Sequence, residues 1–273
     1  MPDASSQKPA AQQVHHELRT AENSAGHVLP KLKAMREKNP HITLLDVGAG
    51  SGTISVTFAK AIPDGHVTAV DLNPGILPRA QAIADESGVT NITFQQADAY
   101  KLPFPDATFD ITYCHQMLTH LKAPWDALAE MLRVTKPGGL VAAREGDLET
   151  ECSWPELAGV QKFHAFAAAM IKFSGGSPNG GRQLLSWALK AGAPRDKITV
   201  SFGTWWYDTP EEKKAWAQGI IDNINGSRLR GAGLKMGLVT EADLEEMVND
   251  WNEWAGRDDA SLAMMHGEIL IER

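Results

Sequence analysis

The strongest local signal in the sequence is LLDVGAGSGTIS, residues Leu44–Ser55. The compact apolar run Ile42–Val47 predicts a buried strand, and the pattern of Thr53–Ala61 predicts a helix. The three glycines between these segments carry no Cβ, so the backbone can turn sharply there and come close to a ligand. The sequence therefore predicts a strand, a ligand-binding loop and a helix.

The same alternation continues along the first half of the chain. Residues 12–38 predict one or two helices, broken near Pro30. Further strands are expected at His66–Asp71, Asn91–Gln96, Phe109–Cys114 and Leu140–Ala143, the last after the turn Lys136–Gly139, with helices after Pro74 and at Pro124–Val134. Strands that alternate with helices of this length indicate a mainly parallel sheet with helices on both faces.

The second half has a different pattern. Residues 154–191 and 210–256 read as helical, and 198–207 and 262–272 read as strands. Seven of the eight tryptophans lie beyond residue 150. Some of them belong to a core, but a cluster of this size is also typical of a pocket for a flat, apolar substrate.

Composition excludes several classes of protein. The 273 residues are 43% hydrophobic and 22% charged, which is typical of a globular protein. The net charge of -8 disfavours nucleic acid as the main partner. Cys114 and Cys152 offer no metal-ligand spacing, and no apolar run reaches the roughly 18 residues of a membrane span. We expect a cytoplasmic protein without a metal.

The glycine loop itself discriminates between ligands. A dinucleotide fingerprint, G-x-G-x-x-G, would have a glycine where this chain has Thr53, and Asp46 would repel a pyrophosphate. A phosphate-binding P-loop is excluded because no Gly-Lys-Ser/Thr follows. S-adenosylmethionine has no phosphate and carries an ammonium and a sulfonium group, so a nearby acid favours it.

Two further acids follow predicted strands. Asp71 lies about 20 residues after the glycine loop, where a carboxylate can accept hydrogen bonds from ribose hydroxyls. Asp98 follows the next strand and could accept a bond from the adenine amine. Asp110 begins a strand instead, so a structural role is expected for it.

Four sequence blocks, in this order, resemble class I S-adenosylmethionine-dependent methyltransferases of the ubiquinone/menaquinone-biosynthesis type. They are LLDVGAGSGT, VTAVDLNPGIL, FQQADAYKLPFPDATFDITYCHQMLTHL and EMLRVTKPGGLVAARE. The N-terminal HHELRTAENSAGHVLPKL and the tryptophan-rich second half look like fungal methyltransferases of secondary metabolites. The resemblance implies a Rossmann-like α/β fold with seven strands, mostly parallel, and an antiparallel last strand.

The resemblance also implies the domain organisation. It predicts a helical cap over residues 1–40, a cofactor-binding core over 41–150, and substrate-binding helices with the last two strands over 151–273. The helical insertion would span about 210–256. The cofactor-binding residues that it implies are Arg19, Thr20, Gly48, Ala49, Gly50, Asp71, Leu72, Asp98, Ala99 and His115.

Methyl transfer requires an aligned acceptor and, for neutral acceptors, a base. His115 after the fourth strand, Glu145 after the fifth and His16 in the N-terminal segment are the catalytic candidates, although Glu145 could instead cap a helix. The expected substrate-binding residues are His164, Trp205, Trp206 and Tyr207.

The predicted function is O-methylation of a hydroxyl (phenol, enol or N-hydroxyl) on an aromatic or alkaloid small molecule, in secondary-metabolite biosynthesis. The product from the cofactor would be S-adenosylhomocysteine, and the protein would be a monomer or homodimer. One alternative is C-, N- or S-methylation, for example of a quinone precursor. Another is a cofactor-binding partner protein without catalysis.

Overall fold

The structure is a computed structural model, and it describes residues 17–273. These residues form two compact units. The larger unit contains Arg19–Thr150, Ile171–Thr204 and Met264–Arg273, and the smaller contains Glu151–Met170 and Trp205–Ala263, with residues 17–18. The predicted division at residues 40 and 150 stays a prediction.

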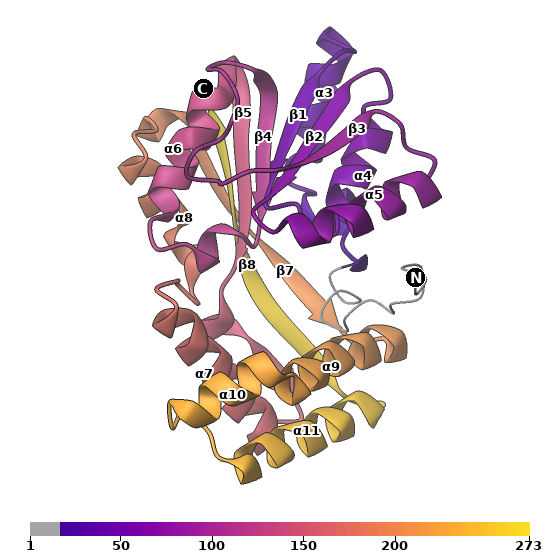
Figure 1. Cartoon of the computed structure of the whole chain (residues 1–273), viewed down its shortest axis with the longest axis vertical. Coiled ribbons are helices and arrows are strands. Elements are labelled where there is room, and N and C mark those ends of the chain that lie inside the picture. Colours follow the sequence, from indigo (N-terminus) through magenta and orange to yellow (C-terminus); the bar gives the residue numbers. More distant parts are fainter. Residues whose placement is uncertain (1–16) are drawn as a thin grey trace, which may run out of the picture. The chain divides into compact units, whose positions relative to one another are not determined.

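Within residues 17–273, eight strands form one sheet. They are β1 (Thr43–Val47), β2 (His66–Asp71), β3 (Ile92–Gln96), β4 (Phe109–His115), β5 (Thr135–Gly146), β6 (Cys152–Trp154), β7 (Ile198–Tyr207) and β8 (Ser261–Glu272). Their order is β3-β2-β1-β4-β5-β8-β6, and β7 also pairs with β8 (Figure 1). The strands β1 to β5 are parallel, and β8 is antiparallel to β5. The α/β fold is therefore confirmed.

The strand count is eight where seven were predicted. The additional strand is β6, whose three residues pair with the first residues of β8. Three residues are too few to show the alternation by which a strand is recognised in a sequence. The strand β5 also begins earlier than predicted, at Thr135, and runs through the expected turn Lys136–Gly139. There Gly138 has a φ of +77°, and the pairing with β4 is interrupted, because Phe109 faces Thr135 and Ile111 faces Leu140.

The helices divide between the two units. The larger unit contains α2 (Ala21–Ser24), α3 (Leu29–Lys38), α4 (Thr53–Ala61), α5 (Leu77–Glu86), α6 (Pro124–Val134) and α8 (Gly180–Lys190), with short 3-10 helices η2 (Pro74–Ile76), η3 (Leu118–His120), η4 (Leu148–Thr150) and η5 (Arg195–Lys197). The smaller unit contains most of α7 (Ala158–Phe173), and all of α9 (Pro210–Asn225), α10 (Ser227–Lys235) and α11 (Glu241–Gly256). Pro30 lies in the first turn of α3, where its missing N–H is not needed.

Neighbouring residues of β1 point to opposite faces of the sheet. Leu44 packs on one face with Phe58 of α4, and Leu45 packs on the other with Met131 of α6. Figure 1 shows α4 and α6 on either side of the strands. Continuous apolar strands with helices on both faces are typical of parallel sheets. This arrangement leaves the carboxyl ends of the strands for a ligand.

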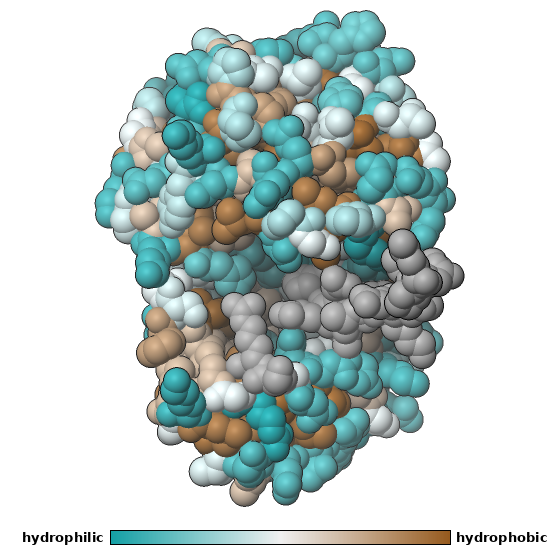
Figure 2. Space-filling model, in the orientation of Figure 1, coloured by the Kyte–Doolittle hydropathy of each residue, from teal (hydrophilic) through white to brown (hydrophobic). Residues whose placement is uncertain are grey.

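The smaller unit has a core of its own. Trp251 and Trp254 are fully buried in it, with ring centroids 5.4 Å apart in an edge-to-face arrangement. Trp187, by contrast, belongs to the core of the larger unit. Within residues 17–273, no helix is long and apolar enough to cross a membrane. The surface of each unit in Figure 2 mixes hydrophilic and hydrophobic residues, as is usual for folded domains.

Candidate functional site

The loop between β1 and α4 has an unusual backbone. Gly48, Gly50 and Gly52 have φ angles of +76°, +56° and +77°, a region that residues with a Cβ rarely adopt. A Cβ on Gly48 would lie 2.5 Å from Cγ of Met117, whereas a Cβ on Gly50 would meet nothing within 4 Å. The loop is therefore packed at one glycine and open at the next.

Asp71, the last residue of β2, holds this loop in place. One carboxylate oxygen accepts a hydrogen bond from the backbone N–H of Gly50 at 2.9 Å, and the other accepts one from Asn73 at 2.9 Å. Because a carboxylate oxygen can accept more than one bond, Asp71 can still receive ligand hydroxyls. Asp98 has a similar place after β3, where it accepts the N–H of Tyr100 at 2.9 Å.

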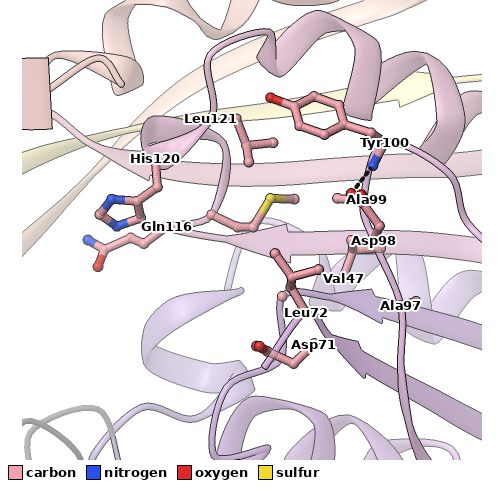
Figure 3. A pocket seen from close by; sticks show the side chains of 12 residues that line it. Val47, Asp71, Leu72, Ala97, Asp98, Ala99, Tyr100, Gln116, His120 and Leu121 are labelled. Atoms are coloured by element: carbon pink, nitrogen blue, oxygen red, sulfur yellow. Dashed lines mark hydrogen bonds between the residues drawn. The ribbon is translucent and has the colours of Figure 1, made fainter. Parts of the chain in front are cut away.

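A cavity of about 350 Å³ lies at these strand ends, within the larger unit. Figure 3 shows the side chains that line it, which come from the ends of β1 and β2 and from the segments after β3 and β4. The lining residues are Val47, Gly48, Asp71, Leu72, Ala97, Asp98, Ala99, Tyr100, Gln116, Met117, His120 and Leu121. Five predicted cofactor residues are thus brought together: Gly48, Asp71, Leu72, Asp98 and Ala99.

The chemistry of this cavity fits S-adenosylmethionine. Its volume lies in the usual range for small-ligand sites, about 300 to 1,000 Å³. Two carboxylates stand among mostly apolar walls, and the twelve described lining residues include no lysine or arginine. Carboxylates accept bonds from hydroxyl and amine groups and attract cations, but they repel phosphates. A nucleoside with a positive charge and no phosphate matches these walls.

The segment Gln116–Leu121 is the part of the cavity that sequence reasoning missed. It follows β4, and Gln116, Met117, His120 and Leu121 all line the cavity. Gln116 has a φ of +48°, which is uncommon for a residue with a side chain. Ligands in open α/β sheets bind beyond the carboxyl ends of the strands, so the position directly after a predicted strand could have pointed to it.

Glu145 holds this segment through its backbone. The side chain is fully buried, and it accepts the N–H groups of Met117, Leu118 and Thr119 at 3.0, 2.9 and 3.2 Å. Burial raises the pKa of the Glu145 carboxyl to about 7, although the three backbone donors act to lower it. These contacts suit a group that positions the cavity wall. A catalytic role for Glu145 stays a prediction.

Three other predicted residues lie beside the cavity. His115 ends β4 and is buried, with Nδ1 3.4 Å from the hydroxyl of Tyr113. Arg19 donates to the side-chain oxygen of Gln116 at 2.8 Å, which places its guanidinium next to a lining residue. Thr20 uses its side chain to cap α2. None of the three is among the described lining residues, so their contacts with a cofactor stay predictions.

The remaining predicted cofactor-binding or catalytic residues in this half of the protein are Ala49, Gly50 and His16. Ala49 donates its N–H to the carbonyl of Val70 at 2.9 Å, and neither Ala49 nor Gly50 is among the described lining residues. Their roles stay predictions. His16 lies outside the described residues.

The predicted substrate-binding residues lie in the smaller unit. Nε2 of His164 is 2.8 Å from a carboxylate oxygen of Glu151, and its ring lies 5.8 Å from that of Trp251. Tyr207 stacks on Trp216 with centroids 4.8 Å apart.

Two neighbouring tryptophans of β7 differ in exposure. Trp205 is 8% exposed and lies edge-to-face against Trp216, whereas Trp206 is 56% exposed. Trp205 therefore belongs to the aromatic cluster of this unit and Trp206 to its surface. Among residues 17–273, no group of three or more His, Cys, Asp or Glu side chains is arranged to hold a metal ion.

Comparison with known proteins identifies the family. The family described as "Methyltransferase domain" matches residues 45–143. An uncharacterized methyltransferase of Schizosaccharomyces pombe, C1B3.06c, is 33% identical over 94% of this chain and 92% of its own length. A protein described as a probable methyltransferase, ltbC of Aspergillus luteorubrus, is 30% identical over 93% and 91%. A ubiquinone/menaquinone biosynthesis C-methyltransferase UbiE, from Ectopseudomonas mendocina, is 39% identical over 39% of this chain and 42% of its own length.

Solved structures share the fold. The YcgJ protein of Bacillus subtilis superposes with a TM-score of 0.55 at 20% identity, over 91% of this chain and 99% of that chain. A phosphoethanolamine N-methyltransferase of Haemonchus contortus, solved with S-adenosyl-L-methionine, gives a TM-score of 0.52 at 16% identity, over 89% and 52%. Together with the full-length relatives, the glycine loop and the acidic cavity place this chain among the class I S-adenosylmethionine-dependent methyltransferases.

Proposed function

We propose that this enzyme transfers a methyl group to a hydroxyl of an aromatic or alkaloid small molecule, in secondary-metabolite biosynthesis. The observation that carries the proposal is the cavity at the strand ends of the larger unit, where two carboxylates stand in a mostly apolar lining and the buried His115 ends β4 directly before the lining residue Gln116. A histidine beside the methyl-donor site is suited to remove a hydroxyl proton. The proposal places the enzyme in the cytoplasm, as a monomer or homodimer that does not act on nucleic acid.

The cavity of the larger unit is the proposed cofactor site. Asp71 would receive the ribose hydroxyls and Asp98 the adenine amine, while Leu72 contacts the adenine face. Bound there, S-adenosylmethionine supplies an electrophilic methyl group on a sulfonium. The lining is mostly apolar and includes Val47, Met117 and Leu121, which would disfavour water beside the bound cofactor.

His115 is the proposed base. A phenol has a pKa near 10 and is protonated at neutral pH, so its oxygen becomes a stronger nucleophile when a base takes the proton. Histidine is suited to this because its ordinary pKa is about 6.5. The hydroxyl of Tyr113, 3.4 Å from Nδ1 of His115, would orient the ring. Glu145 is the rival candidate from the same unit.

Two variants distinguish these bases. His115→Gln should lower turnover by about 100-fold or more and remove the acidic limb of the pH profile if His115 is the base. The affinity of the same variant for S-adenosylhomocysteine separates lost base catalysis from lost cofactor positioning. Glu145→Gln then serves as the matched comparison, and a larger loss of turnover in that variant, with the acidic limb kept in His115→Gln, would assign the base to Glu145.

Methylation at carbon, nitrogen or sulfur is the alternative. The UbiE relative carries the name of a C-methyltransferase, and it matches 39% of this chain. The atom methylated can be identified directly with a cofactor carrying a 13C-labelled methyl group. We expect phenolic, enolic or N-hydroxy aromatic acceptors to give products whose labelled carbon has the NMR shift of a methyl ether. A label bonded to carbon, nitrogen or sulfur would contradict O-methylation and favour the alternative.

A further inference from the structure

The side chain of Gln116 links two distant parts of the sequence. Its oxygen accepts a hydrogen bond from Arg19 Nη2 at 2.8 Å, and its Nε2 lies 2.9 Å from Nε2 of His266 in β8. All three residues belong to the larger unit. Gln116 also lines the proposed cofactor cavity. A three-residue chain of hydrogen bonds therefore runs from the last strand of the sheet to the edge of the cavity.

The direction of every hydrogen bond in this chain follows from one fact. Arginine has donors and no acceptor, so the Gln116 atom facing Arg19 is the oxygen. The amide NH2 of Gln116 then faces His266 and donates to it, which requires Nε2 of His266 to be unprotonated. The proton of the neutral ring is consequently on Nδ1, which lies 3.3 Å from the carbonyl oxygen of Met264.

The surroundings of His266 favour this neutral form. The residue is fully buried. Burial, and then the positive charge of Arg144, lowers the pKa of His266 to about 3, and Arg19 acts in the same direction. A protonated His266 would turn a second N–H toward the amide NH2 of Gln116. It would then lack the acceptor that the hydrogen bond from Gln116 requires.

Gly146 packs closely against this series of hydrogen bonds. A Cβ on Gly146, the β5 residue paired with His266, would lie 3.1 Å from Nε2 of Gln116 and 3.5 Å from Nε2 of His266. The left-handed backbone of Gln116, with a φ of +48°, is uncommon for a residue with a side chain, so it persists where the surroundings hold it. The N–H of Gln116 donates to the carbonyl of Arg144 at 2.9 Å, which fixes the backbone as well.

We propose that His266 and Gln116 are positioning residues, which hold the Arg19 guanidinium beside the cofactor cavity so that it can bind the carboxylate of the cofactor. A planar guanidinium pairs with a carboxylate through two parallel bonds, so its orientation matters. Arginine loses considerable side-chain freedom on binding, and a guanidinium that is already held loses less. This inference rests on the proposed cofactor site.

The first test uses the protein without ligand. NMR of 15N-labelled histidine should show His266 as the neutral, Nδ1-protonated ring from pH 5 to pH 9. Gln116→Glu keeps an acceptor for Arg19 but presents a second acceptor to His266. We therefore expect the pKa of His266 to rise by about two pH units or more in this variant. Gln161→Glu, which adds a charge at an exposed position of α7, should leave the His266 signals unchanged. An Nε2-protonated ring in the wild type, or no rise in Gln116→Glu, would overturn the proposal.

The second test measures cofactor affinity by calorimetry with S-adenosylhomocysteine. Gln116→Met removes both side-chain hydrogen bonds at similar volume, and we expect it to weaken binding about tenfold. Arg19→Lys should weaken binding similarly in the wild type and little in the Gln116→Met background, because the two residues act as a unit. Equal and additive effects of the two substitutions would overturn the positioning role. If the wild type bound no S-adenosylhomocysteine while His266 had the expected tautomer, the cofactor assignment would fail and the hydrogen-bond chain would stand.

Discussion

Buried or half-buried carboxylates near opposite edges of the parallel sheet have pKa values shifted in opposite directions. At the beginning of β4, Asp110 accepts hydrogen bonds from Thr43 and lies 2.9 Å from the ammonium of Lys136. The pKa of Asp110 is lowered, because these bonds and the lysine charge outweigh the partial burial that raises it. Near the opposite edge, the pKa values of Asp46 and Glu145 are both raised to about 7 by full burial.

The opposite pKa shifts distinguish a structural edge of the sheet from the edge that carries the cavity. At the beginning of β4, a cation compensates the charge, and Asp110 joins β1, β4 and β5. At the carboxyl ends, Asp46 accepts a hydrogen bond from Ser55, and Glu145 holds the cavity wall, but neither pairs directly with a cation in the described structure. Carboxylates with raised pKa values cluster at functional sites, which matches the cavity at this end.

The largest effect is expected for the acid that lies in the cavity. Asp71→Ala removes the proposed acceptors for the ribose hydroxyls and the bond that holds Gly50. We expect the affinity for S-adenosylhomocysteine to fall by about 1.5 to 3 kcal/mol, or roughly 10- to 150-fold, in a calorimetric titration. An unchanged dissociation constant would show that the ribose binds elsewhere.

The next effect concerns the dependence of stability on pH. A carboxyl whose pKa is raised by folding favours the folded state fully below its unfolded pKa, and this contribution is lost as the pH rises through the folded value. For Asp46 that window runs from about 4 to about 7. The wild type should therefore lose on the order of 2 kcal/mol of unfolding free energy between pH 5 and pH 7 through this group. Urea titrations of Asp46→Asn should show a correspondingly smaller loss, and parallel pH profiles for the two proteins would refute the prediction.

A smaller effect is expected at Glu145. Glu145→Gln keeps one acceptor but turns an NH2 group toward backbone N–H donors, so the segment Met117–Thr119 loses part of its anchor. We expect S-adenosylhomocysteine to bind about tenfold more weakly. Amide hydrogen exchange at residues 117–119 should be faster in the same variant. Unchanged exchange with lost turnover would instead favour the catalytic role predicted from the sequence.

The smallest effect on cofactor binding is expected for Asp110, at the beginning of β4. Asp110→Asn removes a charge near Lys136 and should reduce stability by about 1 kcal/mol at pH 7. Its contribution is present above the ordinary pKa near 4 and is lost as the pH falls, opposite to that of Asp46. Asp110 lies far along β4 from the cavity. The Asp110→Asn variant should therefore bind S-adenosylhomocysteine with the dissociation constant of the wild type. A weaker affinity would mean that the two ends of the sheet are coupled.

Strong local patterns explain which elements could be predicted. The bounds of α4, α6, β2 and β7 match the sequence expectation because each has a clear start, such as the glycine loop before Thr53 or Pro124 at the first helical position. The strand β6 could not be found, because three residues carry no period. The start of β5 was wrong because a Pro-Gly-Gly sequence usually marks a turn, yet here it forms part of a strand.

For the cavity residues too, only those marked by a local pattern could be predicted. Asp71 ends a strand and Leu72, Asp98 and Ala99 follow strands, and all four line the cavity, while their contacts with a cofactor stay predictions. The contacts of Glu145 and Gln116 depend on which residue of β4 faces which residue of β5 and β8, and no local pattern records that register. Tertiary hydrogen bonds of this kind require the structure.

The methyl-donor site is tested by calorimetric titration of the wild-type protein with S-adenosylhomocysteine, with NAD as the parallel control. We predict micromolar binding of S-adenosylhomocysteine, because the cavity offers carboxylates and apolar walls to a nucleoside without a phosphate, and no binding of NAD. Binding of NAD, or of neither ligand, would contradict the assignment of the cavity between Gly48 and Leu121 as the methyl-donor site.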